Sequence, residues 1–438
     1  MKKPNFILAS STLILIITLT MNSTFKAYAQ ENFTTDQASP PIISEAAILI
    51  DATTGQILYS KNETKKYYPA SITKLMTALL AIEALNPEDT ITFSRNAVLS
   101  IEFGSSHIGI KEDEVLTIDQ AMHGLLLMSA NEIANGLAEK TSGSIDEFAH
   151  DMNDRLKEIG AFNTHFVNPN GLHDENHYTT AYDMALITKE LIKNEYYLNI
   201  MKDITYQIPL TNLSTEIRYL SQQHKMMNEK RDATLYRDDV IAGKTGFTNE
   251  AGHTLVTVAK KDDQVLIVVL LKSSSQNMYE DTSQLLDYGF SNFKPVELTS
   301  SDYEETLPIL QNDSKVGEAI VTLNVPLNIY IESTQEKNSI EFKSELSVLT
   351  VDAKKGDTVG TVSIFSDGTL IATSDAVIND IDIVYFDTDE SKPEKVVKSL
   401  ITVLIPIIIV LFLTTLILYC IRPQKHYSKY KKKNSHRR

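Results

Sequence analysis

Cysteine is almost absent from this chain, whose 438 residues include a single one, Cys420. An intramolecular disulfide is therefore impossible. Cys420 stands inside an apolar stretch near the C-terminus, where a free cysteine behaves as a small apolar residue. Its position also excludes a thiol nucleophile from the part of the chain that precedes this stretch.

Positive charge is scarce outside the two ends. The chain has 41 basic and 57 acidic residues, a net charge of −16. Residues 1–29 hold three of the basic residues and residues 422–438 hold eight, and neither range has an acidic residue. The remainder keeps 30 basic and 57 acidic residues, a net charge of −27. Such an acidic surface argues against nucleic acid as a partner.

Long apolar runs are also confined to the ends. At the N-terminus, two lysines precede an apolar run, and the small residues Ala27 and Ala29 follow it. This order predicts an export signal over residues 1–29 that is cleaved before Gln30, with a retained membrane anchor as the alternative. A polar linker, 30–41, comes next.

The second apolar run, residues 400–421, has no charged residue. At about 1.5 Å per residue it reaches about 33 Å, enough to cross a bilayer. Because basic flanks stay in the cytoplasm, the basic tail 422–438 predicts a single-pass protein of the bacterial cell membrane, with residues 30–399 outside and lipid as a partner. A charged spacer, 387–399, precedes the run. The alternative is a buried core helix.

Hydrophobic periodicity divides the central part of the chain into strands, helices and strands again. Residues 46–59 alternate around Gly55 as a hairpin does. Strand-like runs return at Thr254–Ala259 and Val265–Leu271, before a helical pattern over Met278–Phe293. The helical patterns between these strands begin at Ser71 or cover Asp119–Leu127, Ile133–Glu139, Ile145–Ile159 and Tyr182–Leu198.

This order predicts one domain, residues 42–295, in which both ends of the segment build an antiparallel sheet and the middle forms a helical insertion. From about Val296 short β-rich runs alternate with turns. We expect a small all-β domain over residues 296–386. Its predicted strands cover Ala319–Leu323, Leu327–Ile331, Leu346–Val351, Thr358–Phe365 and Thr369–Thr373.

Three short motifs carry the chemistry. They are Ser71-Ile72-Thr73-Lys74, Ser129-Ala130-Asn131 and Lys244-Thr245-Gly246, which read S-x-x-K, S-x-N and K-T-G. Each is common by itself. In this order, and each in a suitable local setting, they match the set found in serine enzymes that penicillin acylates.

Ser71 and Lys74 are three residues apart at the start of a predicted helix, so they share one face. A serine hydroxyl becomes a nucleophile when a neighbouring base takes its proton. Lys74 serves as that base if burial and a nearby positive charge, which Lys244 offers, lower its pKa. The backbone N–H of Ser71 then lies where it can hold an oxyanion.

The other two motifs supply complementary groups. Ser129 offers a hydroxyl that relays a proton to a leaving amine, and Asn131 offers an amide to Lys74 and to substrate. Lys244 and Thr245 offer a cation and a hydroxyl to a substrate carboxylate. Gly246 allows an extended peptide to approach the strand closely.

With these motifs, the chain resembles the low-molecular-weight penicillin-binding proteins, serine-type D-alanyl-D-alanine carboxypeptidases. Further stretches are similar to that family. They are 51–59, Tyr68-Pro69-Ala70, Asn168-Pro169-Asn170-Gly171-Leu172, 177–183, 243–251 and 353–360. The resemblance covers about residues 42–386. It implies an α/β, β-lactamase-like transpeptidase fold, the small β domain, peptidoglycan stem peptides as substrates and β-lactams as covalent ligands, with no cofactor or metal.

The same resemblance implies roles for single residues. Ser71 would form the acyl-enzyme, Lys74 would accept its proton, Ser129 would transfer a proton and Lys244 would bind the terminal carboxylate. The backbone N–H of Phe247 would complete the oxyanion hole. Two departures are present: Ala130 replaces the glycine common in S-x-N, and residues 222–227 replace an N-x-N-like stretch.

Three other classes remain as alternatives. A serine β-lactamase shares the motifs, and Glu195 begins an E-x-x-L-N match, but this lies 66 residues after Ser129. A zinc carboxypeptidase would use His173 and His177, with His165 nearby, although Gly171 indicates a loop there rather than a ligating helix. A wall-binding protein without activity would keep the fold and lose the chemistry.

Overall fold

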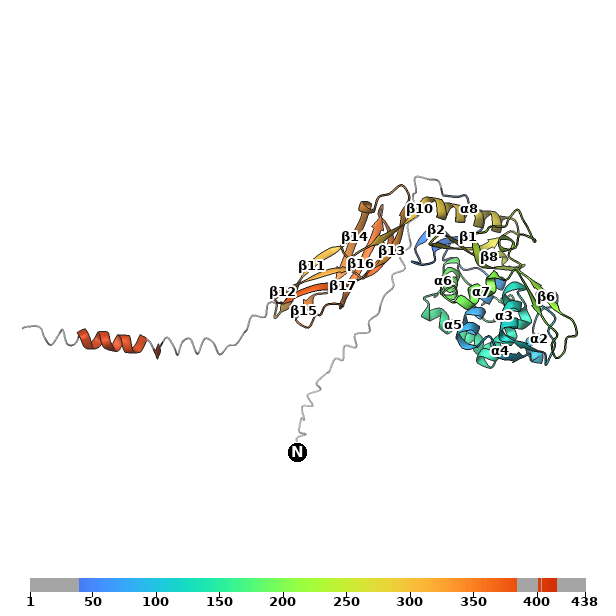
Figure 1. The fold of residues 1–438 in the computed structure, drawn as a ribbon, viewed down its shortest axis with the longest axis horizontal. Helices are drawn as coiled ribbons and strands as arrows, with labels where there is room; N and C mark the ends of the chain where they lie inside the picture. The colour runs from blue at the N-terminus through green and yellow to red at the C-terminus, as the bar shows by residue number, and fades with distance from the viewer. Residues whose placement is uncertain (1–38, 384–400, 403, 416–438) are drawn as a thin grey trace, which may run out of the picture. The chain divides into compact units, whose positions relative to one another are not determined.

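The computed structural model describes residues 39–383, 401–402 and 404–415 (Figure 1). The expected signal peptide, spacer and basic tail lie outside the described residues, as does most of the linker. Contacts divide the chain into two compact units. Among the described residues, the first comprises 39–305, 321–347 and 356–379, and the second comprises 306–320, 348–355 and those from 380 onward. The domain bounds expected from the sequence stay predictions.

A five-stranded antiparallel sheet organises the first unit. Its strand order is β2-β1-β9-β8-β7, so strands from the beginning and the end of residues 42–295 lie side by side. The predicted sheet with a helical insertion is confirmed. The strands are β1 (Ala46–Asp51), β2 (Ile57–Lys61), β7 (Val240–Thr248), β8 (Gly252–Lys261) and β9 (Gln264–Ser273).

The inner strands of this sheet are apolar on both faces. All six residues of β1 are buried, and so are the six central residues of β8 and of β9. A sheet covered by helices on both sides requires such continuous hydrophobic strands. Helix α8 (Asn277–Asn292) lies along one face, and the helical insertion, including α6 (Ala181–Leu191), lies on the other (Figure 1).

The insertion consists of short helices and two small two-stranded sheets. The β3–β4 and β5–β6 pairs are antiparallel. Its elements are η1 (Ala70–Thr73), α1 (Lys74–Ala84), β3 (Thr90–Thr92), α2 (Arg95–Leu99), β4 (Val115–Thr117), α3 (Ile118–Leu127), α4 (Asn131–Ser142), α5 (Ile145–Glu158), α6, α7 (Glu195–Lys202), β5 (Thr205–Ile208), β6 (Arg218–Ser221) and η2 (Lys225–Met227).

One predicted helix is wrong: the pattern over Tyr182–Leu198 is two helices. α6 ends at Leu191, and α7 begins at Glu195 after an extended Asn194. The Asn194 side chain accepts hydrogen bonds from the N–H groups of the second and third residues of α7. Asparagine favours this capping conformation over a helix interior, and apolar periodicity does not register the break.

The C-terminal strands form a two-stranded sheet, β10-β13, and a six-stranded sheet in the order β14-β16-β17-β12-β11-β15. This is the small all-β part implied by the resemblance. The predicted strand over Leu346–Val351 is interrupted, because β14 ends at Leu346 and Leu349 begins a separate short strand that pairs in parallel with Ile309. The strands are β10 (Phe293–Leu298), β11 (Glu304–Gln311), β12 (Ser314–Leu323), β13 (Leu327–Glu332), β14 (Ile340–Leu346), β15 (Leu349–Thr350), β16 (Thr358–Ser366) and β17 (Thr369–Ile383), with η3 at Lys337–Ser339.

The expected transmembrane helix over residues 400–421 is wrong on the evidence of the structure. Among the described residues, no helix combines the length and the apolar character that a bilayer crossing requires. This finding contradicts the predicted single-pass membrane localisation, and it gives no support to lipid as a partner.

The start of the first unit is fastened to α8 by one buried carboxylate. Asp281 accepts hydrogen bonds from the backbone N–H groups of Ile43 and Ser44 at 3.1 and 2.7 Å. It also accepts one from the Ser44 hydroxyl at 2.6 Å. Asp281 and Ser44 are both buried. Because the Ser44 donors are buried and need a partner within the protein, the carboxylate helps to determine how the chain enters β1.

We expect Asp281→Asn to destabilise the protein by about 1–3 kcal/mol, because the amide presents one acceptor oxygen and one donor to a site that holds only donors. Urea unfolding followed by circular dichroism measures this. The matched control is Glu280→Gln, since Glu280 is exposed on the same helix and should change stability by less than about 0.5 kcal/mol. Equal stability of the two variants would refute the anchoring role.

Candidate active site

Ser71 lies in a tight turn that precedes a helix. The predicted α-helix begins there as a 3-10 turn, η1, and continues as α1 from Lys74. Ala70 has a positive φ of 52°, which L-residues rarely adopt. Two hydrogen bonds hold the turn: the Thr73 hydroxyl donates to the Ala70 carbonyl at 2.9 Å and contacts His177 Nε2 at 2.8 Å. The serine therefore stands at a point that the surroundings fix.

A loop from the helical insertion closes against this turn. Gly171 has a φ of +83°, and a Cβ there would lie 1.9 Å from the Ala70 carbonyl oxygen, so a side chain cannot be accommodated. The side chain of Asn168 accepts from the Gly171 N–H at 2.7 Å. The loop brings the backbone carbonyl of Asn170 to Lys74. The sequence did not predict this contact, although residues 168–172 resemble the family.

Lys74 is completely buried and has three oxygen neighbours. Its Nζ lies 3.1 Å from Ser71 Oγ, 2.6 Å from Asn131 Oδ1 and 2.6 Å from the Asn170 carbonyl. An ammonium donates to all three. A neutral amine donates two hydrogens to the Asn131 and Asn170 oxygens and turns its lone pair to the Ser71 hydroxyl. The predicted Ser71–Lys74 contact is present.

The pKa of Lys74 is well below its ordinary value. Burial is the main cause, because the charged form loses its hydration. The nearby Lys244 lowers the pKa further, and the carboxylate of Glu132 acts in the opposite direction. Burial and a neighbouring cation are the two causes expected from the sequence.

The S-x-N motif approaches from the loop between α3 and α4. Ser129 has a positive φ of 60°, and Asn131 is the first residue of α4. Both residues are buried. The Asn131 N–H donates to the Ser106 carbonyl at 2.9 Å while its side chain holds Lys74. The motif therefore joins the lysine to the loop that precedes β4.

The K-T-G motif lies on β7, the edge strand of the sheet. Lys244 is 2% exposed, and its Nζ donates to Ser129 Oγ and to the Thr245 carbonyl, each at 2.9 Å. Burial lowers the pKa of Lys244 to about 7. A Cβ on Gly246 would lie 2.9 Å from the Ser71 backbone nitrogen, so this strand passes directly beside the nucleophile. The Phe247 ring is exposed and packs on His253.

All three motifs therefore meet in one place. Lys74 links the first to the second through Asn131, Lys244 links the second to the third through Ser129, and Gly246 adjoins Ser71. Two buried lysines with lowered pKa values beside two serine hydroxyls are suited to proton transfer near neutral pH.

The histidines considered as zinc ligands have other partners. His177 Nδ1 accepts from the Val167 N–H at 3.1 Å, and Nε2 contacts the Thr73 hydroxyl. Burial lowers the pKa of His177 to about 3, so the ring is neutral and holds the Ser71 turn. The Tyr68 and His173 rings meet edge to face. Glu195 of the E-x-x-L-N match is exposed in the first turn of α7, where a carboxylate stabilises the helix.

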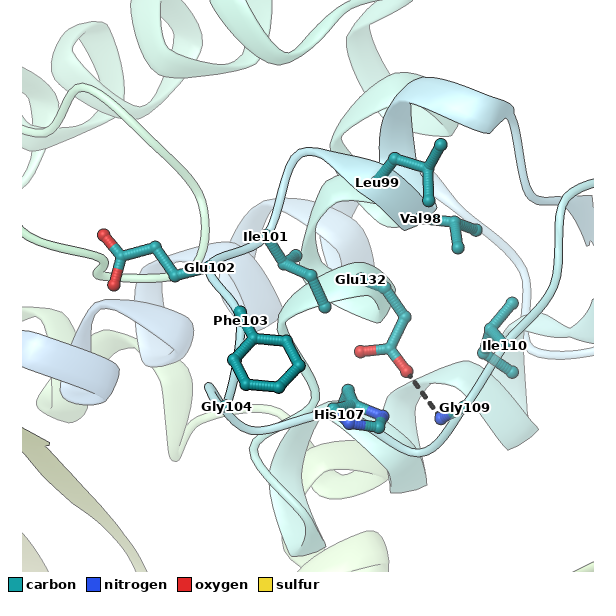
Figure 2. Close-up of a pocket in the computed structure, with 10 residues that line it drawn as sticks. All are labelled: Val98, Leu99, Ile101, Glu102, Phe103, Gly104, His107, Gly109, Ile110 and Glu132. Carbon is teal, nitrogen blue, oxygen red and sulfur yellow. Dashed lines mark hydrogen bonds between the residues drawn. The ribbon is translucent and has the colours of Figure 1, made fainter.

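Glu132 is a further buried charge that sequence reasoning missed. It follows Asn131 in the first turn of α4 and is 1% exposed. Its Oε1 accepts from the N–H groups of Ile108 and Gly109 at 2.7 and 3.1 Å, and the contact with Gly109 is drawn in Figure 2. Within the described chain, Oε2 has no hydrogen-bond partner.

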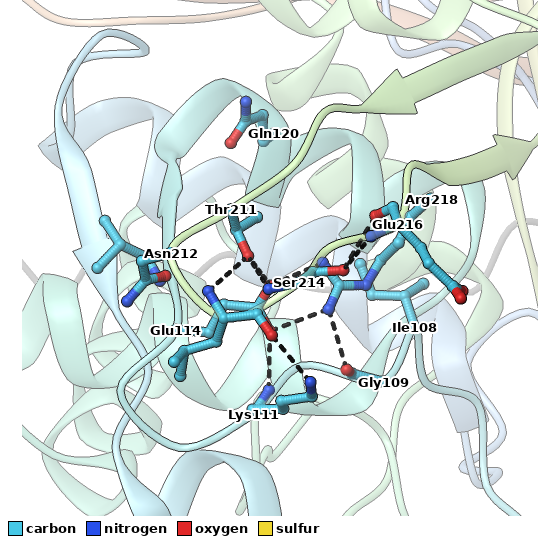
Figure 3. A network of polar contacts seen from close by, with 12 residues as sticks. Ile108, Gly109, Lys111, Glu114, Gln120, Thr211, Asn212, Ser214, Glu216 and Arg218 are labelled. Atoms are coloured by element: carbon cyan, nitrogen blue, oxygen red, sulfur yellow. Dashed lines mark hydrogen bonds and ion pairs between the residues drawn. The ribbon is translucent and has the colours of Figure 1, made fainter.

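The same loop is clamped from its other side by an ion pair (Figure 3). Arg218 donates to both oxygens of Glu114 at 2.7 and 2.9 Å and to the Gly109 carbonyl at 3.1 Å. The Thr211 hydroxyl and the Lys111 N–H also donate to Glu114, at 2.6 and 3.0 Å. Arg218, at the start of β6, thus holds the carbonyl of Gly109, and the N–H of Gly109 donates to Glu132.

The ion pair also controls the ionisation of Glu114. Burial alone raises the pKa of this carboxyl, but the hydrogen bonds from Arg218, Thr211 and Lys111 outweigh burial and leave the pKa below its ordinary value. A carboxylate with a lowered pKa stabilises the fold above its unfolded-state pKa, and this contribution is lost as the pH falls through the folded-state pKa.

Solved structures define the class of enzyme that has this fold. Penicillin-binding protein 5 from Haemophilus influenzae matches 79% of this chain and 99% of its own, with a TM-score of 0.66 and 25% identity. The chain belongs to the family of D-alanyl-D-alanine carboxypeptidases, whose family model matches residues 32–275. The resemblance drawn from the motifs is confirmed, and the protein is a hydrolase of this family rather than a β-lactamase.

Two curated relatives carry the same description. D-alanyl-D-alanine carboxypeptidase DacF of Bacillus subtilis (strain 168) is 30% identical over 343 residues, which are 76% of this chain and 84% of DacF. The enzyme DacD of Escherichia coli (strain K12) is 28% identical over 359 residues, covering 78% of this chain and 86% of DacD. Both alignments extend well beyond the part that contains the three motifs.

We expect Arg218→Met to destabilise the protein by about 3 kcal/mol at pH 7, because it leaves a buried carboxylate unpaired. In the variant, burial raises the pKa of Glu114, so protonation relieves the defect and the difference from the wild type narrows between pH 7 and pH 5. Chemical denaturation at both pH values measures this.

The control is Arg95→Met. Arg95 pairs with Glu112 at 3.2 Å, but both side chains are largely exposed, so the loss should stay below about 1 kcal/mol at either pH. A difference for Arg218→Met that is small or independent of pH would show that the pair does not stabilise the loop.

Proposed function

We propose that Ser71 is the nucleophile by which this enzyme removes the terminal D-alanine from peptidoglycan stem peptides. The observation that carries the proposal is the contact of Ser71 Oγ with the buried Nζ of Lys74 at 3.1 Å. With its lowered pKa, Lys74 is more readily neutral than an ordinary lysine and accepts the Ser71 proton as Oγ attacks the carbonyl carbon of the penultimate D-alanine.

The substrate binds along the exposed edge of β7. An extended peptide adds to such an edge through backbone hydrogen bonds, and Gly246 allows close approach. Lys244 in its charged form holds the terminal carboxylate, with the Thr245 hydroxyl beside it. The N–H groups of Ser71 and Phe247 receive the negative charge that develops on the carbonyl oxygen.

Collapse of the tetrahedral intermediate breaks the peptide bond. The proton held by Lys74 passes through the Ser129 hydroxyl to the nitrogen of the leaving D-alanine, and the acyl-enzyme on Ser71 remains. Asn131 keeps Lys74 oriented during both transfers. A water molecule then attacks the ester, with Lys74 again taking the proton, and regenerates the Ser71 hydroxyl.

The same steps account for β-lactams as covalent ligands. Ser71 Oγ attacks the β-lactam carbonyl and is acylated as it is by the peptide, the ring C–N bond breaks, and the nitrogen takes the proton but stays tethered to the acyl group. The tethered group hinders entry of the hydrolytic water, so the ester persists. Release of D-alanine and stable labelling by penicillin are thus two readouts of one nucleophile.

We expect Ser71→Ala to abolish both D-alanine release from a D-Ala-D-Ala pentapeptide and covalent labelling by a fluorescent penicillin. The fold should be retained, because Oγ contributes one hydrogen bond, and Lys74 keeps its contacts with Asn131 Oδ1 and the Asn170 carbonyl. The control, Ser291→Ala, changes an exposed serine of α8 and should keep full labelling. A labelled Ser71→Ala protein would place the nucleophile elsewhere.

The pKa of about 7 for Lys244 predicts an alkaline limit for free-carboxylate substrates. As the pH rises through this value, Lys244 loses its charge and kcat/KM for the peptide acid should fall, while kcat/KM for the corresponding C-terminal amide should not. Lys244→Gln should remove this difference between acid and amide.

The Lys244→Gln variant also tests the coupling of the two lysines. Removing the charge of Lys244 raises the pKa of Lys74, so the acidic limb of the pH–rate profile should move to higher pH. The acylation rate of a penicillin, measured from pH 5 to 10, reports both limbs. An unchanged profile in the variant would contradict the assigned roles.

A further inference from the structure

Glu132 is a buried carboxylate directly beside the residue that holds Lys74. It follows Asn131 in the first turn of α4 and is 1% exposed. Its Oε1 accepts from the N–H groups of Ile108 and Gly109, whereas Oε2 has no hydrogen-bond partner among the described residues. A buried charge that is only partly hydrogen-bonded is costly, so its presence at this position requires an explanation.

The segment that Glu132 holds, residues 106–109, is bonded to the start of α4 at a second point. The Asn131 N–H donates to the Ser106 carbonyl at 2.9 Å, so the first two residues of α4 both bind this segment. The turn that leads into α4 contains Ser129, whose φ is +60°. Such a conformation persists only where the surrounding structure holds it, and the segment 106–109 is part of that support.

Two charged groups act on Lys74, and they act in opposite directions. Burial is the main cause of the lowered pKa of Lys74, Lys244 lowers the pKa further, and Glu132 raises it. His177 also faces this part of the site, but its ring is neutral because burial lowers its pKa to about 3. Glu132 is thus the carboxylate that opposes Lys244 among the described neighbours of Lys74.

The other titratable groups near Glu132 are either exposed or paired with each other. Glu102 and His107 belong to the loop between α2 and β4 and are exposed, so water and salt screen them. Farther along the same loop, Arg218 and Glu114 form an ion pair at 2.7 Å that balances its own charge. The charge of Glu132 therefore acts mainly on the buried lysine of the S-x-x-K motif.

We propose that Glu132 is a positioning residue for Lys74, which it supports both as a clamp and as a charge. As a clamp, it holds the first turn of α4, whose Asn131 side chain orients Lys74 Nζ. As a charge, it compensates the second positive charge that arises in the pocket when Lys74 takes the proton of Ser71. The inference rests on the proposed function, in which this proton transfer starts the reaction.

Without such compensation, the proton transfer would leave two ammonium groups in one buried pocket. The repulsion between like charges is strong where water is excluded, and here it would make Lys74 a weak base. Glu132 offsets part of this repulsion. Lys74 can then be neutral before Ser71 attacks and still hold the proton afterwards, which is what a general base requires.

The variant Glu132→Gln separates the charge from the clamp, because the amide keeps an acceptor oxygen for the two backbone N–H groups. We expect the pKa of Lys74 to fall further in this variant, so the acidic limb of penicillin acylation should move to lower pH. The maximal acylation rate should fall by about tenfold, since a weaker base accepts the proton less readily. A purely structural role would lower the rate without moving the limb.

Two comparisons test whether the effect belongs to this carboxylate. Glu102→Gln removes an exposed carboxylate of the neighbouring loop and should leave the acidic limb in place. Lys244→Gln moves the limb to higher pH, so combining it with Glu132→Gln should return the limb close to its wild-type position. Equal shifts in the two glutamate variants would indicate a general effect of surface charge and overturn the role of Glu132.

The clamp is tested by Glu132→Leu, which removes the acceptor oxygen together with the charge. Its maximal acylation rate should lie below that of Glu132→Gln, because the segment 106–109 no longer holds the start of α4. Equal maximal rates in the two variants would overturn the clamp. If the leucine variant does not fold, the glutamine variant still decides whether the charge acts on Lys74.

Direct titration of Lys74 keeps this inference separate from the proposed function. The full chain, labelled with ¹³C at lysine Cε, is titrated as wild type and as Glu132→Gln. A Lys74 signal that titrates at lower pH in the variant supports the role of the charge, and an unchanged signal overturns it whatever the acylation rates are. If the signal moves but the acidic limb of acylation does not, the charge of Glu132 acts as inferred and the proposed function fails, because Lys74 is then not the base.

Discussion

The structure around the active site depends on one buried amino group. Lys74 Nζ has no access to water and is surrounded by three oxygens from three different segments of the chain. Transfer of an ammonium from water to such a place is unfavourable, so the site favours the neutral amine. The burial that lowers the pKa of Lys74 is thus the same feature that makes it a base for Ser71.

Several parts of the fold hold Ser71 and Lys74 in place. The sheet brings β7 beside the nucleophile, the loop at Gly171 closes on Ala70, and neutral His177 holds Thr73. Farther out, Arg218 fixes the loop that carries Gly109. Ala70 and Ser129 both have positive φ angles, at 52° and 60°. Such conformations persist where the surrounding structure overdetermines them, which is common at functional sites.

Much of this arrangement could be predicted from the sequence. The strands at both ends of residues 42–295 and the helical insertion between them followed from periodicity, and the resemblance to a known family implied that the three motifs converge. The contact of Asn170 did not, because it uses a backbone carbonyl that every residue has. The Glu114–Arg218 pair was also missed, since ion-pair partners about a hundred residues apart leave no local pattern. Glu132 was missed because its partners are backbone N–H groups.

Two expectations about helices are wrong. Apolar periodicity continues through residues 182–198, but it does not measure where helical hydrogen bonding stops. In the first case the Asn194 side chain takes over the backbone N–H groups and starts a new helix. In the second, the prediction over residues 400–421, no helix among the described residues has the length and apolar character for a bilayer crossing.

The central claim, that burial keeps Lys74 neutral beside Ser71, is tested most directly by its titration. In protein labelled with ¹³C at lysine Cε, the signals of the two active-site lysines are assigned by their loss in Lys74→Arg and Lys244→Arg. The account predicts that Lys74 titrates well below the ordinary lysine pKa of about 10.4. A Lys74 signal that titrates near that ordinary value would contradict it.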